Sequence, residues 1–169
     1  MLYFIKTDYF NHAIYGGKVN EKGVLILIYH KEVQSEKELL EVYPIIKQLR
    51  PHLDETAFLT LVSKAQASEN YKLFALCNDD MPVALAGFLP RVSLSQGVHV
   101  WVADLITCKK HRSKGYGKQL LRIVEKWARE HGCCTVALSS GTARKRAHRF
   151  YEEKMDYKKA SYLYRKTLS

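Results

Sequence analysis

The feature that most constrains this chain is a short glycine-containing loop between an apolar run and an amphipathic helix. The loop reads Arg112-Ser113-Lys114-Gly115-Tyr116-Gly117, and the apolar run before it, Val98–Thr107, predicts a strand. After the loop, apolar residues recur on one helical face: Leu120, Leu121, Val124, Trp127 and Ala128. Free N–H groups at a helix start bind phosphate, and glycine lets the backbone approach a ligand closely. The loop therefore predicts an anionic ligand at a strand-to-helix junction.

The first half of the chain predicts one strand followed by two helices. Val24–Tyr29 is a short apolar run rich in branched residues, which favours a buried strand. Ser35 can cap a helix that Pro44 should kink or divide, and Asp54 can cap a second helix. We assign residues 1–22, which mix aromatic and polar side chains, to an N-terminal extension packed on the domain. An edge hairpin and a partner-binding arm are the alternatives for this segment.

The second half predicts a hairpin and then two strands joined by the amphipathic helix. The hairpin runs are Tyr71–Cys77 and Pro82–Val92, which are separated by a polar turn. A helical crossover joins Val98–Thr107 to the apolar run Cys133–Leu138, so these two strands should be parallel. The end of the chain adds a helix around Ala143–Lys154 and a strand around Ser161–Lys166. This order predicts a mixed α/β (α+β) fold in which helices flank a mostly antiparallel sheet.

The composition favours one globular domain in the cytoplasm. The chain has 169 residues, 47% of them apolar, and it lacks both an apolar run of membrane-spanning length and a signal-peptide core. Its four cysteines lack a C-x-x-C spacing and its seven histidines lack a ligand pattern, so we expect buried thiols and no metal. A formal net charge of +10 attracts anions, whether nucleic acid, acidic protein or a phosphorylated cofactor.

Two common nucleotide-binding patterns do not fit the loop, because Walker A requires G-x-x-x-x-G-K-[ST] and the dinucleotide fingerprint requires three glycines. The loop instead resembles the R/Q-x-x-G-x-G/A signature of the GCN5-related N-acetyltransferase (GNAT) family, with Arg112, Gly115 and Gly117 at its fixed positions. Downstream, Ala147–Tyr157 resembles the family's A-x-x-F-Y-E-x-x-G-F element. The resemblance covers roughly residues 24–166, and we assign residues 23–169 to a GNAT acetyltransferase domain.

The resemblance implies acetyl-coenzyme A (acetyl-CoA) as cosubstrate and a sheet in which two parallel strands splay apart. The pantetheine arm would bind the backbone of Leu105, Ile106 and Thr107 on the first of these strands. The other cofactor contacts carried over from the family are Arg112, Ser113, Lys114, Gly115, Tyr116, Gly117, Lys118, Arg144 and Ala147. Arg144 stands where many members have an asparagine, and its charge could meet a phosphate instead. Asp156 replaces a glycine at a turn, where aspartate tolerates a left-handed backbone.

The resemblance also assigns an acid, and the sequence offers a base. Tyr151 matches the family tyrosine near the cofactor sulfur, where its hydroxyl would protonate the departing thiolate. The alternative is a core tyrosine, because Ala147, Phe150 and Tyr151 share one helical face. Asp104 is the candidate base for the amine, and its alternatives are a cap for a bulge or a partner for a buried lysine or histidine. Three histidines are weaker candidates for the base: His99, His111 and His148.

These residues predict an enzyme that moves an acetyl group from acetyl-CoA to a primary amine by direct attack in a ternary complex. The acceptor would be a small-molecule or peptide amine, no membrane partner is expected, and the sequence leaves a homodimer open. One other class of function is a nucleic-acid-binding module, which the net charge favours and the lack of an RNP, KH or zinc-finger pattern disfavours. Another is an acyl-CoA-binding sensor that has lost catalysis.

Overall fold

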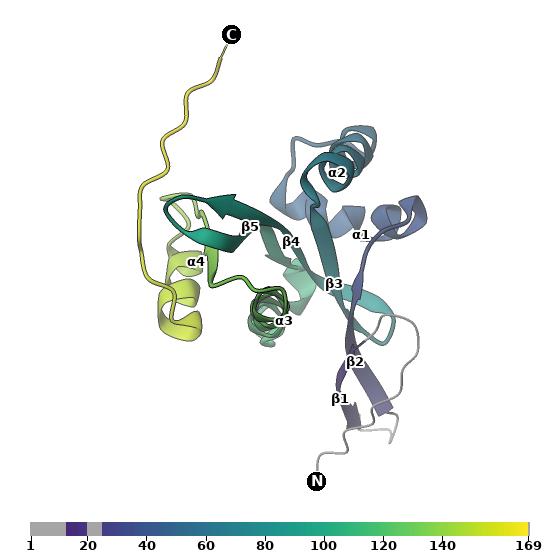
Figure 1. Cartoon of the computed structure of the whole chain (residues 1–169). Helices are drawn as coiled ribbons and strands as arrows, with labels where there is room; N and C mark the ends of the chain where they lie inside the picture. Colours follow the sequence, from purple (N-terminus) through teal and green to yellow (C-terminus); the bar gives the residue numbers. More distant parts are fainter. Residues whose placement is uncertain (1–12, 20–24, 169) are drawn as a thin grey trace.

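A six-stranded sheet organises the part of the chain that the computed structural model describes, residues 13–19 and 25–168 (Figure 1). Its strands follow chain order: β1 (Ala13–Val19), β2 (Leu25–Glu32), β3 (Lys72–Asn78), β4 (Met81–Ser93), β5 (Gly97–Thr107) and β6 (Thr135–Leu138). Neighbours from β1 to β5 are antiparallel, and β6 is parallel to β5. The predicted mixed, mostly antiparallel sheet is therefore confirmed. Of the predicted extension over residues 1–22, only 13–19 lie within the described residues, where they form β1.

Helices cover both faces of this sheet (Figure 1). The first pair, α1 (Glu36–Leu49) and α2 (Glu55–Glu69), packs on one face, and α3 (Tyr116–Glu130) packs on the other. The short α4 (Lys145–Arg149) continues as a π-helix over Phe150–Lys154 beside β6. None of the helices in the described segments is long and apolar enough to cross a membrane.

The two predicted N-caps start α1 and α2. The Ser35 hydroxyl accepts a hydrogen bond from the Glu38 N–H at 3.3 Å, and the Glu38 carboxylate accepts one from the Ser35 N–H at 3.1 Å. The Asp54 carboxylate accepts from the N–H of Ala57 at 2.7 Å. Pro44 lies inside α1 without dividing it, because apolar residues on both sides of the proline are buried against the sheet.

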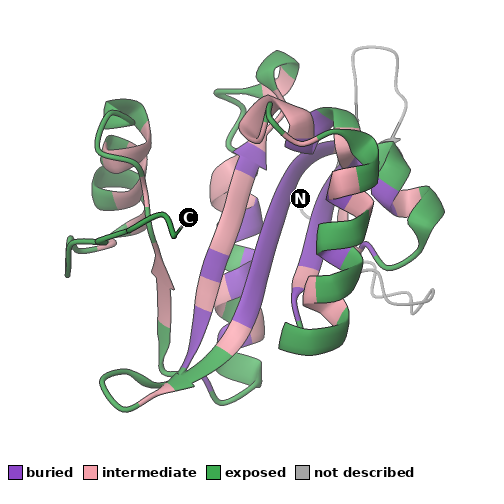
Figure 2. Cartoon of the chain, turned by 90° about the horizontal axis from the view of Figure 1, so that it is seen from above, coloured by how far each residue is buried: buried purple, intermediate pink, exposed green. Residues whose placement is uncertain are grey.

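The core lies in two layers, one on each face of the central strands (Figure 2). Seven consecutive residues of β4, Val83–Leu89, are all buried, which explains why its sequence is almost continuously apolar. Phe88 is fully buried and meets the Phe74 ring edge-on at 5.0 Å between centroids. The central strands are thereby fixed from both faces, so β5 has a rigid support.

Two sequence predictions are wrong, the strand over residues 161–166 and the burial of all cysteines. No strand forms over residues 161–166, because a strand needs a hydrogen-bonded neighbour and the described residues provide none beside this segment. The cysteines are not all buried either: Cys77 and Cys133 are, whereas Cys134 is exposed beside the short edge strand β6. Asp156 does adopt the predicted left-handed backbone, with φ 58°.

Candidate active site

The loop after β5 turns the chain sharply into α3. Ser113 and Gly115 both have left-handed backbones, with φ 63° and 84°, and Gly115 is the N-cap of α3. The Gln119 N–H bonds to the Gly115 carbonyl at 3.0 Å, whereas the N–H groups of residues 116–118 have no acceptor within the described segments. These free N–H groups and the helix dipole suit a phosphate, so the geometry fits the anionic ligand that the sequence predicts.

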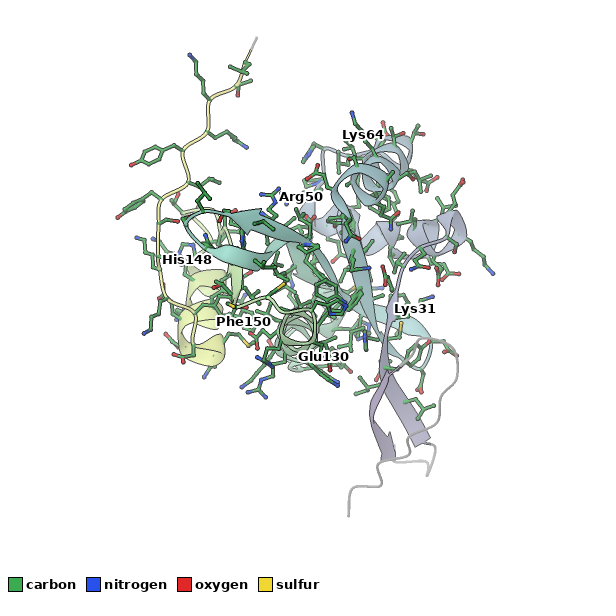
Figure 3. All side chains as sticks on the ribbon, in the orientation of Figure 1. Lys31, Arg50, Lys64, Glu130, His148 and Phe150 are labelled. Atoms are coloured by element: carbon green, nitrogen blue, oxygen red, sulfur yellow. The ribbon has the colours of Figure 1, made fainter. Side chains whose placement is uncertain are left out.

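Gly117 lies where three elements meet. A Cβ at this position would lie 3.1 Å from Thr107 Oγ1, at the end of β5, and 3.9 Å from Cζ of Phe150. The first turn of α3 therefore packs tightly against the end of β5, and a side chain at this position would be in ordinary van der Waals contact with Phe150 of the π-helix, which is labelled in Figure 3. This packing brings the helix that carries Tyr151 to the glycine loop.

The parallel pair β5 and β6 opens after its first few residues. His99–Val102 pairs with Thr135–Leu138, and beyond this point the described residues give β5 no neighbour on its β6 side. Figure 2 shows β6 diverging from β5 toward α4. The open part of β5 is residues 103–107, which include the predicted cofactor-contacting residues 105–107. The splayed arrangement leaves their backbone free on one side, as strand addition by an extended ligand requires.

A β-bulge interrupts β5 just before these residues. Gly87 pairs with Asp104 and Phe88 pairs with Val102, so Ala103 is an extra residue opposite β4. The Ala103 carbonyl accepts a hydrogen bond from a terminal nitrogen of Arg50 at 3.2 Å. The bulge is thus held by a side chain from α1.

The Asp104 carboxylate is the centre of a side-chain cluster. Arg50, the C-cap of α1, contacts Oδ1 through Nε at 2.9 Å and Nη2 at 2.8 Å, and the Tyr71 hydroxyl donates to Oδ2 at 3.1 Å. Burial and the nearby Asp104 charge raise the pKa of Tyr71 well above its usual value, which keeps this hydroxyl a donor. A Cβ at Gly87 would overlap the Tyr71 hydroxyl, so the cluster also requires this glycine. Asp104 thus pairs with Arg50, whose side chain is 40% exposed, in place of the buried lysine or histidine that the sequence offered as an alternative.

Tyr151 is half-buried within the aromatic packing around the π-helix. Its ring centroid lies 5.2 Å from that of Phe150 and 6.0 Å from that of Tyr157. Burial raises the pKa of Tyr151, and the opposing effect of the Arg144 charge is smaller. The hydroxyl is therefore protonated at neutral pH and can act as a proton donor. Arg144 itself is exposed at the N-cap of α4, and Ala147 is half-buried in the same helix.

Basic side chains surround the loop. Arg112 Nε approaches the Thr107 carbonyl at 3.4 Å and links the loop to the end of β5. A groove of about 620 Å³ lies beside α3, and its basic lining residues are Lys114, Lys118, Arg122, Lys126 and Arg129. This groove extends the positive surface from the loop along the helix, where anions would be attracted.

The candidate histidines are engaged elsewhere or lie apart from the cluster. His99 is buried, with Nδ1 3.0 Å from the Gly97 carbonyl, and His148 Nε2 is 2.9 Å from the Gly141 carbonyl. His111 lies in a short 3₁₀ helix, Lys109–His111, before the loop. In the described part of the chain, no three His, Cys, Asp or Glu side chains come together as a metal site.

Sequence reasoning missed Arg50, Tyr71 and Gly87. Arg50 and Tyr71 lie 54 and 33 positions before Asp104, so no local pattern connects them. Only Gly87 carried a signal, because a glycine inside an apolar strand often marks a close approach of another group.

The family model for "Acetyltransferase (GNAT) family" matches residues 37–157. The chain belongs to the GNAT family. It is also 47% identical to "Uncharacterized N-acetyltransferase YhdJ" of Bacillus subtilis (strain 168) over 140 residues, which are 83% of this chain and 99% of that protein. This GNAT protein is accordingly an acetyl-CoA-dependent N-acetyltransferase.

Solved structures share the fold of this GNAT protein at low sequence identity. A transcriptional regulator from Bacillus halodurans C-125 is 20% identical, with a TM-score of 0.74, over 83% of this chain and 99% of that chain. Aminoglycoside N-acetyltransferase AAC(6')-Iy in complex with CoA is 18% identical, with a TM-score of 0.71, over 83% of this chain and 95% of that chain. These likenesses confirm the predicted GNAT-like fold.

Proposed function

We propose that this protein transfers the acetyl group directly to a primary amine of a small molecule or peptide in a ternary complex, with Tyr151 as general acid. The observation that carries this proposal is the junction at Gly117, which packs the Tyr151-bearing helix against the end of β5 and the start of α3. Acetyl-CoA supplies the acetyl group as a thioester.

The chain offers two kinds of contact to the cofactor. The free N–H groups of residues 116–118 would bind its phosphates, with Ser113 and Gly115 shaping the turn. The backbone of Leu105, Ile106 and Thr107 would hold the pantetheine arm as an added strand. Ala147, which is half-buried in α4, would also contact the cofactor. Four cationic side chains would supply charge-assisted contacts to the phosphates: Arg112, Lys114, Lys118 and Arg144.

Tyr151 would act at the departing sulfur. The amine nitrogen attacks the thioester carbonyl carbon, the carbon–sulfur bond breaks, and the thiolate takes the proton of the Tyr151 hydroxyl. The Tyr151 hydroxyl is protonated at neutral pH, as that of a tyrosine with an unshifted pKa also is, so it has a proton to donate. The phenolate is then reprotonated from solvent before the next turnover.

Asp104 would receive the proton that the amine loses. An ionised carboxylate offers about four acceptor positions. Arg50 uses two on Oδ1 and Tyr71 uses one on Oδ2, which leaves one position on Oδ2 for the acceptor. The side chain is 18% exposed, so an amine can reach it. The same carboxylate would attract the ammonium form of the substrate.

A small-molecule amine is supported by one of the fold neighbours, which is an aminoglycoside N-acetyltransferase solved with a CoA-linked acetylneamine analogue. A pool of alkylamines, aminoglycosides and peptides, assayed for acetyl-CoA consumption, would identify the acceptor. Acetyl transfer to any of them would exclude the sensor without catalysis.

The test of the acid is Tyr151→Phe, which keeps the ring packing and removes the hydroxyl. We expect kcat to fall about 100-fold, within the range for general acid catalysis, while KM for acetyl-CoA stays unchanged. Tyr164→Phe is the matched control, because Tyr164 is 89% exposed on the C-terminal segment. A turnover within twofold of wild type would reject Tyr151 as the acid.

The test of the base is Asp104→Asn with two amines. An alkylamine is protonated at neutral pH and needs a base, whereas a weakly basic aromatic amine is already neutral. We expect about a 100-fold loss of kcat/KM for the alkylamine and a much smaller loss for the aromatic amine. Equal losses for both would mean that Asp104 positions β5 and does not accept the proton.

A further inference from the structure

One face of α3 carries a row of four cationic side chains. Lys118, Arg122 and Lys126 follow one another at four-residue intervals, and Arg129 extends the row by three residues. Like charges at this spacing are neighbours on a helix and destabilise it. Lys126 has an exposed partner in Glu130 at 3.6 Å, and the described segments contain no ion pair to the other three. We call these four residues the basic row.

The basic row lines the groove of about 620 Å³ beside α3, together with Lys114 from the loop. Among the described residues that line this groove, every charged one is cationic and none is aromatic. The groove therefore lacks the aromatic platforms on which single-stranded nucleic acid stacks its bases. The basic row spans about 16 Å of the helix axis and repeats about every 6 Å. An acidic helix with carboxylates four residues apart has the same repeat, so it fits the groove in charge and in spacing.

The basic row starts beside the loop that would bind the cofactor phosphates. Lys118 belongs to both, since its N–H is one of the free groups at the start of α3 and its side chain lines the groove. α3 packs on the face of the sheet opposite α1 and α2 (Figure 1), whereas Arg50, Tyr71 and Asp104 meet on the α1 side. A protein seated on the basic row would thus approach the site of the acetyl donor and not that of the amine.

We propose that this protein also takes its acetyl group from an acidic carrier protein that bears the thioester on a phosphopantetheine arm attached to a serine. The inference rests on the proposed cofactor site, because the arm from phosphate to sulfur is the same chemical group in this donor and in acetyl-CoA. A carrier phosphate at the N–H groups of residues 116–118 would therefore place the thioester beside the open part of β5. An acidic helix next to the carrier's serine would lie on the basic row.

The reaction with this donor balances in the same way as the reaction with acetyl-CoA. The amine nitrogen bonds to the acetyl carbon and loses a proton, and the carbon–sulfur bond breaks. The departing sulfur takes up a proton, so the carrier leaves with a free thiol on its arm.

The basic row would act mainly on how fast and in which orientation the carrier binds. Exposed ion pairs contribute little one at a time, but a cationic surface attracts an acidic protein over a distance and orients it. Arg122 and Lys126 lie about 10 Å and 16 Å along α3 from Gly115. These two residues should therefore distinguish the carrier from acetyl-CoA, whose phosphates would bind at the loop.

The first test is the affinity for a bacterial acyl carrier protein loaded with acetyl-phosphopantetheine, measured by isothermal titration calorimetry at about 50 mM salt. We expect Arg122→Glu combined with Lys126→Glu to weaken this binding about tenfold or more and to leave the affinity for acetyl-CoA within twofold. The matched control is Lys37→Glu combined with Lys64→Glu, which changes the net charge by the same amount. Both lysines are exposed on the helices of the other face, and Lys64 is labelled in Figure 3.

Three results of this test would overturn the proposal. One is an equal loss of carrier binding in the two double variants, which would mean that only the net charge matters. Another is an equal loss of acetyl-CoA affinity in the variant of the basic row, which would make the row part of the CoA site. The third is binding of a duplex RNA that this variant abolishes, without binding of the carrier, which would assign the row to nucleic acid.

The second test compares three donors with an amine acceptor: acetyl-CoA, the loaded carrier, and acetyl-phosphopantetheine without the protein. We expect kcat/KM for the carrier to exceed that for the free arm about tenfold or more, and this advantage to disappear at high salt. A carrier no better than the free arm would overturn the inference, while transfer from acetyl-CoA would leave the proposed function standing. No transfer from any of the three donors would reject the proposed function as well.

Discussion

Two sites adjoin the open half of β5, one formed by backbone groups and the other formed by side chains. We call them the cofactor flank and the side-chain flank. On the cofactor flank, the backbone forms the site: left-handed residues at 113 and 115 and free N–H groups at 116–118. On the side-chain flank, Arg50 (labelled in Figure 3) contacts Asp104, which also accepts a hydrogen bond from Tyr71, at a β-bulge. The first flank comes from one short stretch of sequence, and the second joins three distant stretches.

This difference predicts how each flank responds to substitution. A site made of backbone groups tolerates changes of its exposed side chains but not of its glycines, since these determine where the backbone can go. A site made of side chains is damaged by any change that leaves one partner unpaired, because a desolvated charge without its partner is costly. Variants on the cofactor flank should therefore weaken the binding of acetyl-CoA, and variants on the side-chain flank should impair the reaction of the amine.

The largest effect is expected from Gly117→Val on the cofactor flank. Even an alanine Cβ would lie 3.1 Å from Thr107 Oγ1, and the branched valine side chain would push α3 away from β5 and Phe150. The N–H groups that bind phosphate would move with the helix. We expect acetyl-CoA affinity, measured by isothermal titration calorimetry, to fall about 100-fold, or about 2.8 kcal/mol.

Two variants sharpen this result. Gly117→Ala should cost less than about tenfold in affinity, because Thr107 needs to move by only a few tenths of an ångström. Gly141→Val is the control, since nothing lies within 4 Å of a Cβ at Gly141. An unchanged affinity for Gly117→Val would mean that the loop backbone does not determine cofactor binding.

The next effect is expected from Gly87→Ala, which tests the side-chain flank. The new Cβ would overlap the Tyr71 hydroxyl and force Tyr71 away from Asp104, so we expect a loss of about 2 kcal/mol in the free energy of unfolding by urea denaturation. Combining it with Tyr71→Phe removes the oxygen, which is the nearest overlapping atom, and leaves ring atom Cζ at 2.5 Å from the new Cβ, so the ring still has to shift. The double variant should lose less stability than the two single variants added together. Additive losses would mean that Gly87 and Tyr71 do not depend on each other.

The same contrast explains what the sequence could predict. The sequence predicts the anion-binding loop because its geometry is local: Gly115 and Gly117 lie within a few residues of the strand and the helix that they join. The sequence does not predict the contact between Arg50 and Asp104, because these residues meet only after α1 has packed on the sheet. The strand predicted over residues 161–166 has the right composition, but a strand also needs a neighbour, and composition does not say where that neighbour is.

A smaller effect is expected from Arg50→Met, which should impair the reaction of the amine without weakening the binding of acetyl-CoA. The variant keeps much of the packing of the arginine stem and removes the charge that holds Asp104 and the Ala103 carbonyl. We expect kcat/KM for the amine to fall about tenfold while the dissociation constant for acetyl-CoA stays within twofold. Arg91→Met is the control, because the Arg91–Glu69 pair is exposed and 3.7 Å long. An equal loss of acetyl-CoA affinity in Arg50→Met would show that the two flanks are not independent.

The smallest effect is expected at the other end of α1, where Glu38 completes the capping box that starts the helix leading to Arg50. Burial acts to raise the pKa of Glu38, but hydrogen bonds from the Ser35 and Gln34 N–H groups and from Lys31 outweigh it and lower the pKa to about 2 from 4.5. A carboxylate with a depressed pKa stabilises the fold above its unfolded pKa, and this contribution is lost as the pH falls from about 4.5 to about 2. Glu38→Gln should therefore cost about 1 kcal/mol at neutral pH and remove this part of the acid sensitivity, as measured by urea denaturation across that range.

Glu41→Gln is the control, because the Glu41 carboxylate is 45% exposed and lies 3.7 Å from the same Lys31. If wild type and Glu38→Gln lost stability in parallel on acidification, the side-chain contacts at this end of α1 would not contribute to the stability of the helix that positions Arg50.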